Sequence, residues 1–223
     1  MFDWCFLVLG ITGVVLIVYF LVELHYFLRT LLCVIVARFF KKKKHILDVT
    51  EVTGVCMSND IDYLLDHMNN ARYLRELDFA KVDFYERTGL YNKLIAKGGS
   101  LYAGASTIRY RRFIKVFSKY RISTKIIYWD NQNIYIEHKF MTGDNFVNAI
   151  ALCRIRLVKI DAEELMKDLM SNLPKNVADV APERKEKPLI PPDLEKWIES
   201  NRISSDKLRE NNKIDNRVEI SKV

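Results

Sequence analysis

The stretch that decides the fold is residues 60–81, which read DIDYLLDHMNNARYLRELDFAK. From Asn70 onward, apolar residues recur at helical spacing as far as Thr88, and Gly89 follows. Asparagine side chains accept hydrogen bonds from the free amides of a helix start, and glycine favours a helix end. The pattern therefore predicts a long helix over 70–88, preceded by a polar loop that begins at Asp60.

Strand-like patterns lie on both sides of this helix. β-branched residues over 46–58 predict a first strand, and apolar residues in strand patterns predict four more, over 101–110, 120–129, 134–141 and 146–160. The turn sequences at 130–133 and 142–145 join the last three of these strands as antiparallel neighbours. Because a curled sheet around one helix buries the apolar faces of both, we expect an α+β fold in which an antiparallel sheet wraps around a long central helix.

Apolar and polar residues are distributed unevenly along the 223 residues, and the distribution predicts five regions. They are a membrane anchor over 1–40, a basic juxtamembrane run over 41–45, a globular domain over 46–172, a linker over 173–192, and a C-terminal helix with a polar tail over 193–223. A short amphipathic helix is expected over 161–172. Another is expected over 193–211, after a Pro-Pro pair, and the last dozen residues are expected to be disordered.

The first region has the composition of a transmembrane helix. Trp4–Val22 holds nineteen residues without a formal charge, which is long enough to cross the hydrocarbon core. Arg38 and the basic run follow it, so the domain is expected on the cytosolic side, with Tyr26–Phe40 as a helix along the membrane surface. The alternative is a cleaved signal peptide and a secreted protein, although no good cleavage site follows the apolar segment.

Charge and cysteine content exclude two classes of function. The net charge is +7, but much of the excess lies in Lys41–Lys44 beside the apolar segment, so no nucleic-acid partner is predicted. The four cysteines form no C-x-x-C pair and have no zinc-like spacing to histidine, so no metal site is predicted.

The stretch 60–81 resembles the 4-hydroxybenzoyl-CoA thioesterase-like branch of the hot-dog superfamily. That branch typically reads D-x-D, a short spacer, GH-V-NN-x-x-Y-L, and an acidic residue before A-R. The matching residues are Asp60, Asp62, His67, Asn69, Asn70, Tyr73, Leu74, Asp78, Ala80 and Lys81. The resemblance implies a hot-dog fold, dimerisation through edge strands, a role in lipid metabolism at the endoplasmic reticulum, and hydrolysis of acyl-CoA thioesters.

The residues before the helix suit that chemistry. Free amides at the start of a helix stabilise the negative charge that develops on a thioester oxygen. The resemblance makes Asp62 the carboxylate that activates water, with His67 and Asn69 completing the candidate catalytic set. The cationic side chains Arg109, Arg111, Arg112 and Lys115 are candidates for the phosphates of coenzyme A. Coenzyme A enters only as part of the substrate, and no cofactor is predicted.

Two departures from the family pattern bear on catalysis. Asp66 stands where the family has a glycine, and Asp62 is five positions before His67, one more than the branch commonly has. An extra loop residue shifts the carboxylate relative to the helix amides, and a shift of about 1 Å can reduce a rate roughly a hundredfold.

Each candidate residue also has an alternative structural role. His67 can serve only to hold the loop, Asn69 can be only a helix cap, and the basic strand can be a solvated face. The alternative function is a non-catalytic hot-dog protein that binds acyl groups or scaffolds partners at a membrane.

Overall fold

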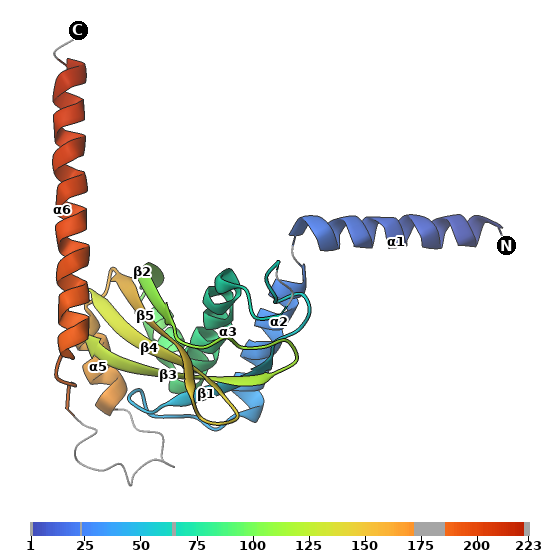
Figure 1. Cartoon of the computed structure of the whole chain (residues 1–223), viewed down its shortest axis with the longest axis horizontal. Helices are drawn as coiled ribbons and strands as arrows, with labels where there is room; N and C mark the ends of the chain where they lie inside the picture. The colour runs from blue at the N-terminus through green and yellow to red at the C-terminus, as the bar shows by residue number, and fades with distance from the viewer. Residues whose placement is uncertain (1, 23, 64–65, 172–185, 221–223) are drawn as a thin grey trace. The chain divides into compact units, whose positions relative to one another are not determined.

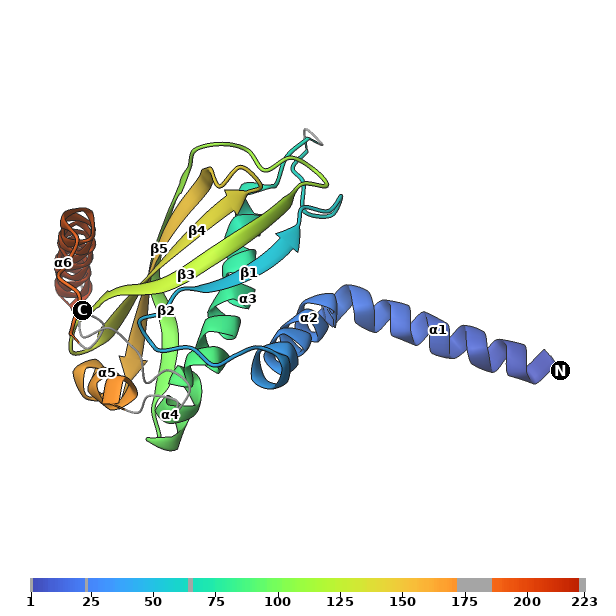
Figure 2. The ribbon, with the colours of Figure 1, turned by 90° about the horizontal axis from the view of Figure 1, so that it is seen from below.

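The computed structural model describes residues 2–22, 24–63, 66–171 and 186–220. Within these ranges one five-stranded antiparallel sheet has the order β1-β3-β4-β5-β2. Its strands are β1 (Thr50–Val55), β2 (Ser100–Tyr110), β3 (Lys119–Trp129), β4 (Asn133–Thr142) and β5 (Val147–Val158). The sheet curls around the long helix α3 (Asn70–Thr88), as Figures 1 and 2 show. This confirms the hot-dog arrangement predicted from the sequence.

The limits of α3 are set by the two signals that the sequence contains. The Asn69 side chain accepts a hydrogen bond from the Ala71 amide at 2.8 Å, and Gly89 ends the helix with a φ of 75°. Leu77 and Phe84 lie on the buried face of α3, within the apolar core. The predicted helix over 70–88 is therefore confirmed residue for residue.

The core lies between α3 and the concave face of the sheet. On β5, the predicted inward face is buried throughout, at Ala149, Ala151, Cys153, Ile155 and Leu157. The strand register brings neighbouring apolar residues together, for example Ile122 of β3 opposite Phe140 of β4. A bulge between Ala103 and Ala105 in β2 shifts its pairing with β5.

The other helices agree with the sequence prediction in part. The predicted helix over 161–172 is α5 (Ala162–Ser171), and the predicted C-terminal helix is α6 (Pro192–Ile220), which continues past its expected end at residue 211. The short helix α4 (Leu90–Ala96) was not predicted, because seven residues carry too little periodicity to reveal it. Most of the predicted linker lies outside the described residues.

The N-terminal segment forms three elements, namely α1 (Phe2–Val22), α2 (Leu24–Ile35) and the π-helical turn η1 (Val36–Phe40). No single helix in the described residues passes the test of length and apolar composition for crossing a membrane. Trp4–Tyr19 and Leu24–Phe40, which are bent by 76° relative to one another, pass that test as a pair.

Helix α2 packs against α3 (Figure 2), and an ion pair to a buried carboxylate joins the two helices. The Arg29 guanidinium donates two hydrogen bonds to the Glu76 carboxylate, at 2.5 and 2.6 Å, and lies 3.9 Å from the centre of the Phe79 ring. The Tyr120 hydroxyl donates to the same carboxylate at 2.8 Å. A buried carboxylate needs such partners, because removing a charge from water is costly.

Two further carboxylates of α3 have partners from the residues that follow α2. Arg38 donates two hydrogen bonds to Glu86, at 3.0 and 3.1 Å, and Lys41 forms an ion pair of 2.6 Å with Asp83. The Lys43 ammonium donates to the backbone carbonyl of Glu86 at 2.9 Å. Part of the basic run therefore contacts the central helix of the domain.

A histidine lies deep in the sheet. His138 of β4 is fully buried, and its Nδ1 lies 2.9 Å from the hydroxyl oxygen of Thr124. Within the described residues its Nε2 has no hydrogen-bond partner. Burial, with a smaller contribution from the Lys81 charge, lowers the pKa of His138 to about 3.

We expect this histidine to make the fold acid-sensitive. Below a pH of about 6.5 the unfolded chain binds a proton at His138, whereas the native state does so only near the lowered pKa of about 3. Since the unfolded state binds more protons in that window, the free energy of unfolding falls as pH decreases through it. Urea unfolding at several pH values should show a flatter dependence for the Thr124→Val and His138→Leu double variant. An unchanged slope would contradict the assignment.

Candidate functional site

The loop between β1 and α3 carries the candidate catalytic residues, and backbone pairing holds it in place. Ile61 pairs with Met68 in an isolated antiparallel bridge, and His67 pairs with Lys115 in another. The Asp62 amide also donates to the His67 carbonyl at 3.0 Å. These pairings hold Asp62 beside His67 and lead the chain to the start of α3.

Asp60 fixes the base of this loop. It is almost fully buried, it is ion-paired with Arg72 in the first turn of α3, and its carboxylate accepts a hydrogen bond from the Met57 amide at 2.8 Å. Its backbone carbonyl accepts from the Asn69 amide at 2.8 Å. Through these contacts the Asp60 carboxylate connects the segment after β1 to α3. Asp60 is therefore a positioning residue.

His67 lies between two carboxylates. Asp66 contacts Nδ1 of the imidazole, and an oxygen of Asp62 lies 3.4 Å from Nε2. The ring stacks on Phe113, with 4.0 Å between the ring centres, and is mostly buried. The Asp62 side chain is 15% exposed and therefore retains limited access to water. The structure thus brings together two of the three predicted catalytic residues, Asp62 and His67.

The amides at the start of α3 are largely occupied. Met68 donates to the Ile114 carbonyl at 2.9 Å, Ala71 donates to the Asn69 side chain, and Arg72 donates to the Asn69 carbonyl at 2.9 Å. In the described part of the chain, the Asn70 amide has no such acceptor. One N–H at the positive end of the helix dipole is therefore available to a ligand.

Asn69 itself is a helix cap. Its side-chain oxygen is directed to the Ala71 amide and its backbone has the extended conformation that is usual for a cap. Two alternative roles were predicted for Asn69 from the sequence, a catalytic residue or a helix cap. The structure shows the capping contact.

A cation could also bind at this loop. Donor atoms of Asp62, Asp66 and His67 lie within 4.8 Å of one another, which is close enough to share an ion. Three donors are fewer than the four of a structural zinc site. The predicted absence of a metal stays a prediction.

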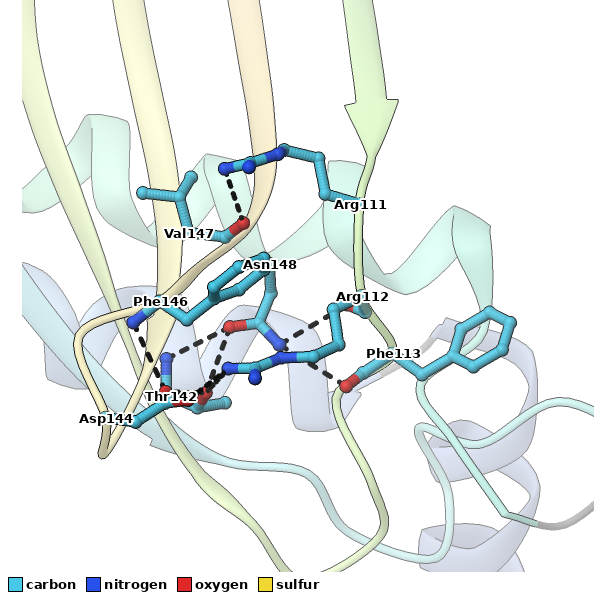
Figure 3. A network of polar contacts seen from close by, with 8 residues as sticks. All are labelled: Arg111, Arg112, Phe113, Thr142, Asp144, Phe146, Val147 and Asn148. Atoms are coloured by element: carbon cyan, nitrogen blue, oxygen red, sulfur yellow. Dashed lines mark hydrogen bonds and ion pairs between the residues drawn. The ribbon is translucent and has the colours of Figure 1, made fainter.

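The cationic candidates occupy the end of β2 and the loop that follows it. Arg109 is exposed on β2, opposite Ile150 of β5. Arg111 donates to the Val147 carbonyl at 3.2 Å, and the Arg112 guanidinium lies 3.9 Å from the centre of the Phe146 ring. Figure 3 shows how Arg111 and Arg112 meet the turn between β4 and β5. The loop continues past Phe113, which brings Lys115 beside His67.

Arg112 is strongly engaged within the protein. It forms a hydrogen-bonded ion pair of 2.5 Å with Asp144, and hydrogen bonding to Arg112 and then to Thr142 lowers the pKa of Asp144 to about 2 (Figure 3). Asn148 belongs to the same network. Its side-chain amide nitrogen donates to the backbone carbonyls of Arg112 and Phe113. Arg112 therefore holds the loop in place, and Arg109 remains on an exposed strand.

A groove runs along α3 on the side of β2. Its volume is about 760 Å³, and its walls come from α2, α3, β2 and β5, at Tyr26, Phe27, Leu74, Asp78, Ser106 and Cys153. Ala71 and Arg72 line it as well, so the groove reaches the start of α3. Its lining mixes apolar residues with charged ones, which include Arg75 and Lys81.

Four residues of this region were not assigned to it from the sequence. Asp66 was visible only as a departure from the family pattern, and Phe113 gave no signal, because it is 46 positions from the ring on which it stacks. Tyr26 and Phe27 lie in a segment whose composition predicts a membrane surface. Contacts between segments so distant in the chain are not encoded in local periodicity.

Comparison with known proteins gives a consistent result. A sequence profile of the thioesterase-like superfamily matches residues 56–198. Protein THEM6 of Drosophila melanogaster is 40% identical over 197 residues, which are 88% of this chain and 96% of that protein. Protein THEM6 of Xenopus laevis is 32% identical over 92% of this chain and 93% of that protein. This chain belongs to the thioesterase-like superfamily.

Among solved structures, this thioesterase-like chain is similar to the probable thioesterase YbaW of Escherichia coli. The TM-score is 0.49 at 19% sequence identity, over 55% of this chain and 95% of that one. The gentisyl-coenzyme A thioesterase BH1999 has a TM-score of 0.48 at 16% identity, over 55% of this chain and all of that chain.

The cap can be tested separately from catalysis. We expect Asn69→Ala to reduce the free energy of unfolding by ~1 kcal/mol, because the Ala71 amide loses its acceptor. Asn69→Asp should retain most of the stability, since a carboxylate caps a helix equally well. Urea unfolding of the three proteins measures both effects, and equal stability of the alanine variant and the parent would exclude the cap.

Proposed function

We propose that this protein is a membrane-anchored acyl-CoA thioesterase that hydrolyses long-chain acyl-CoA thioesters. The observation that carries the proposal is the contact between Asp62 and His67 at the start of α3, in a chain of the thioesterase-like superfamily. The pair combines a carboxylate with an imidazole beside a helix N-terminus, where an acyl-transfer site needs a base and a donor for developing negative charge.

The proposed reaction is the hydrolysis of a thioester by water. Asp62 accepts a proton as the water oxygen attacks the carbonyl carbon, and the Asn70 amide with the helix dipole stabilises the resulting oxyanion. His67, which Asp66 orients through Nδ1, donates a proton from Nε2 to the departing sulfur as the carbon–sulfur bond breaks. The proton that Asp62 took from water then passes to Nε2, 3.4 Å away, which restores both groups. The products are a carboxylic acid and free coenzyme A.

The groove and the basic strand suit the two ends of an acyl-CoA. The groove of about 760 Å³ reaches the start of α3 and offers the exposed Leu74 to an acyl chain. Arg109 is exposed at the end of β2, and Lys115 is exposed beside His67. Both are therefore free to meet phosphate groups, whereas Arg112 is committed to Asp144.

A homodimer is the proposed assembly. β2 forms one edge of the sheet, and its residues are mostly exposed. An exposed edge presents unpaired backbone groups to another strand. Pairing of two copies through this edge would also cover the groove beside it.

The proposed location is the endoplasmic reticulum, with α1 in the membrane and the domain facing the cytosol. Support comes from the uncharged stretch Trp4–Val22 and the basic residues that follow it. The alternative, secretion after signal cleavage, predicts a mature protein that lacks residues 1–22. The intact mass of the purified protein distinguishes the two.

Asp62 provides the test of catalysis. We expect Asp62→Asn to reduce the turnover of palmitoyl-CoA by the full chain about 100-fold or more, which is a usual effect of losing a general base. Asp193→Asn, on the exposed first turn of α6, is the matched control and should leave turnover unchanged. Turnover that does not depend on Asp62 would remove this residue from the mechanism.

A non-catalytic acyl-binding protein is the second candidate. It is favoured by the occupied amides at the start of α3, because Met68, Ala71 and Arg72 already donate to acceptors of the protein. That function predicts saturable binding of acyl-CoA without turnover. Robust turnover that Asp62→Asn abolishes would exclude it.

A further inference from the structure

The segment α2–η1 carries an exposed apolar face. Seven large apolar side chains lie on it with exposed fractions between 38% and 79%, at Phe27, Leu28, Leu31, Leu32, Ile35, Phe39 and Phe40. They recur at spacings of one, three and four residues, which places them on one side of a helix. Exposed apolar side chains grouped in this way mark a binding surface.

The opposite side of the same helix is attached to the domain. Tyr26, Arg29 and Cys33 contact Asp78, Glu76 and the Phe79 carbonyl of α3, respectively. At about 100° per residue, these three positions lie roughly 180° from the centre of the apolar face. One side of α2 is thus committed to α3, and the other is presented outward.

Ion pairs between partly exposed cations and buried carboxylates make this attachment firm. Glu76, Asp83 and Glu86 are almost fully buried, and their partners Arg29, Lys41 and Arg38 all come from α2–η1 or the residue that follows it. Breaking a pair would remove a cation from a buried carboxylate, which is unfavourable even where Tyr120 still donates to Glu76 or Arg87 still pairs with Asp83. The apolar face is therefore a fixed feature of the domain.

We propose that this apolar face lies in the interfacial region of a lipid bilayer and holds the domain at a fixed orientation on the membrane. The inference extends the anchoring in the proposed function. Two observations select lipid as the occupant. The face follows directly after α1, whose large apolar side chains between Trp4 and Tyr19 are exposed. No acidic residue occurs from Leu24 to Lys44, and the exposed Lys42 can meet anionic headgroups.

The surface has a consequence for substrate access. Phe27 belongs to the apolar face and also lines the groove along α3. With the face in the bilayer, the groove opens beside the acyl region of the lipids. The substrate class that fits is then an amphiphile whose acyl chain enters from the membrane while its polar part remains in water.

Site-directed spin labelling of the full chain in phosphatidylcholine and phosphatidylserine vesicles tests the proposal. The exposed Cys5 and half-buried Cys33 are changed to serine, and a nitroxide is attached at Leu31→Cys on the apolar face. Val15→Cys in α1 and Ile203→Cys in α6, with exposed fractions of 54% and 58%, serve as the anchor and control positions. Power saturation compares collision with oxygen, which enriches in lipid, and with a water-soluble nickel complex.

We expect the Leu31 label to collide more with oxygen than with nickel, and the Ile203 label to show the reverse. A second outcome is that the labels at Leu31 and Ile203 both collide more with nickel while the label at Val15 collides more with oxygen. This result would support the transmembrane anchor and refute the interfacial position of the apolar face. Lipid at Leu31 with water at Val15 would support the face and contradict the transmembrane anchor. Shielding of Leu31 from both reagents would assign the face to a protein partner or a second copy. Acyl-CoA turnover, measured on the same samples, reports separately on the catalytic proposal.

Discussion

Three buried carboxylates on the central helix constrain the rest of this structure. Glu76, Asp83 and Glu86 of α3 have side chains that are 6% exposed or less, and each is paired with a cation from residues 29–41. A carboxylate can remain ionised in such a position only when its partners replace the water that it has lost. The segment that composition alone places in a membrane anchor is therefore a structural part of the hot-dog domain, and it determines which side of α3 is covered.

Helix α3 connects the candidate site to the contact between α2 and α3, here called the α2–α3 joint. Its first turn is fixed by the Asn69 cap and by the pair of Arg72 with Asp60, and the loop held there places Asp62 beside His67. On the face of α3 toward β2, the groove has walls from α2 as well as from the sheet. A displacement of α2 would thus alter the groove and expose the buried acids, although α2 supplies no residue to the catalytic set.

The sequence predicted the elements better than their contacts. The helix over 70–88 was found at its true limits because capping residues and apolar spacing are local signals, and the strands were found through their alternation. Arg29 is separated from its partner Glu76 by 47 positions in the sequence. Arg112 is separated from its partner Asp144 by 32 positions. Only the tertiary fold brings such distant partners together. The resemblance likewise identified Asp62 and His67, but it did not reveal that Asp66 contacts the imidazole or that most nearby amides are occupied.

A double-mutant cycle at the α2–α3 joint tests most directly whether the N-terminal segment belongs to the domain. Unfolding free energies of the full chain in mild detergent are measured for the parent, Arg29→Ala, Glu76→Ala and the double variant. If the buried pair exists, the two changes are non-additive, with a coupling free energy of about 1–3 kcal/mol. The exposed pair Arg202 and Glu199 of α6 is the control and should couple by less than about 1 kcal/mol. Additive effects of Arg29→Ala and Glu76→Ala would contradict the joint, and the apolar face of α2 would then lose its fixed position on the domain.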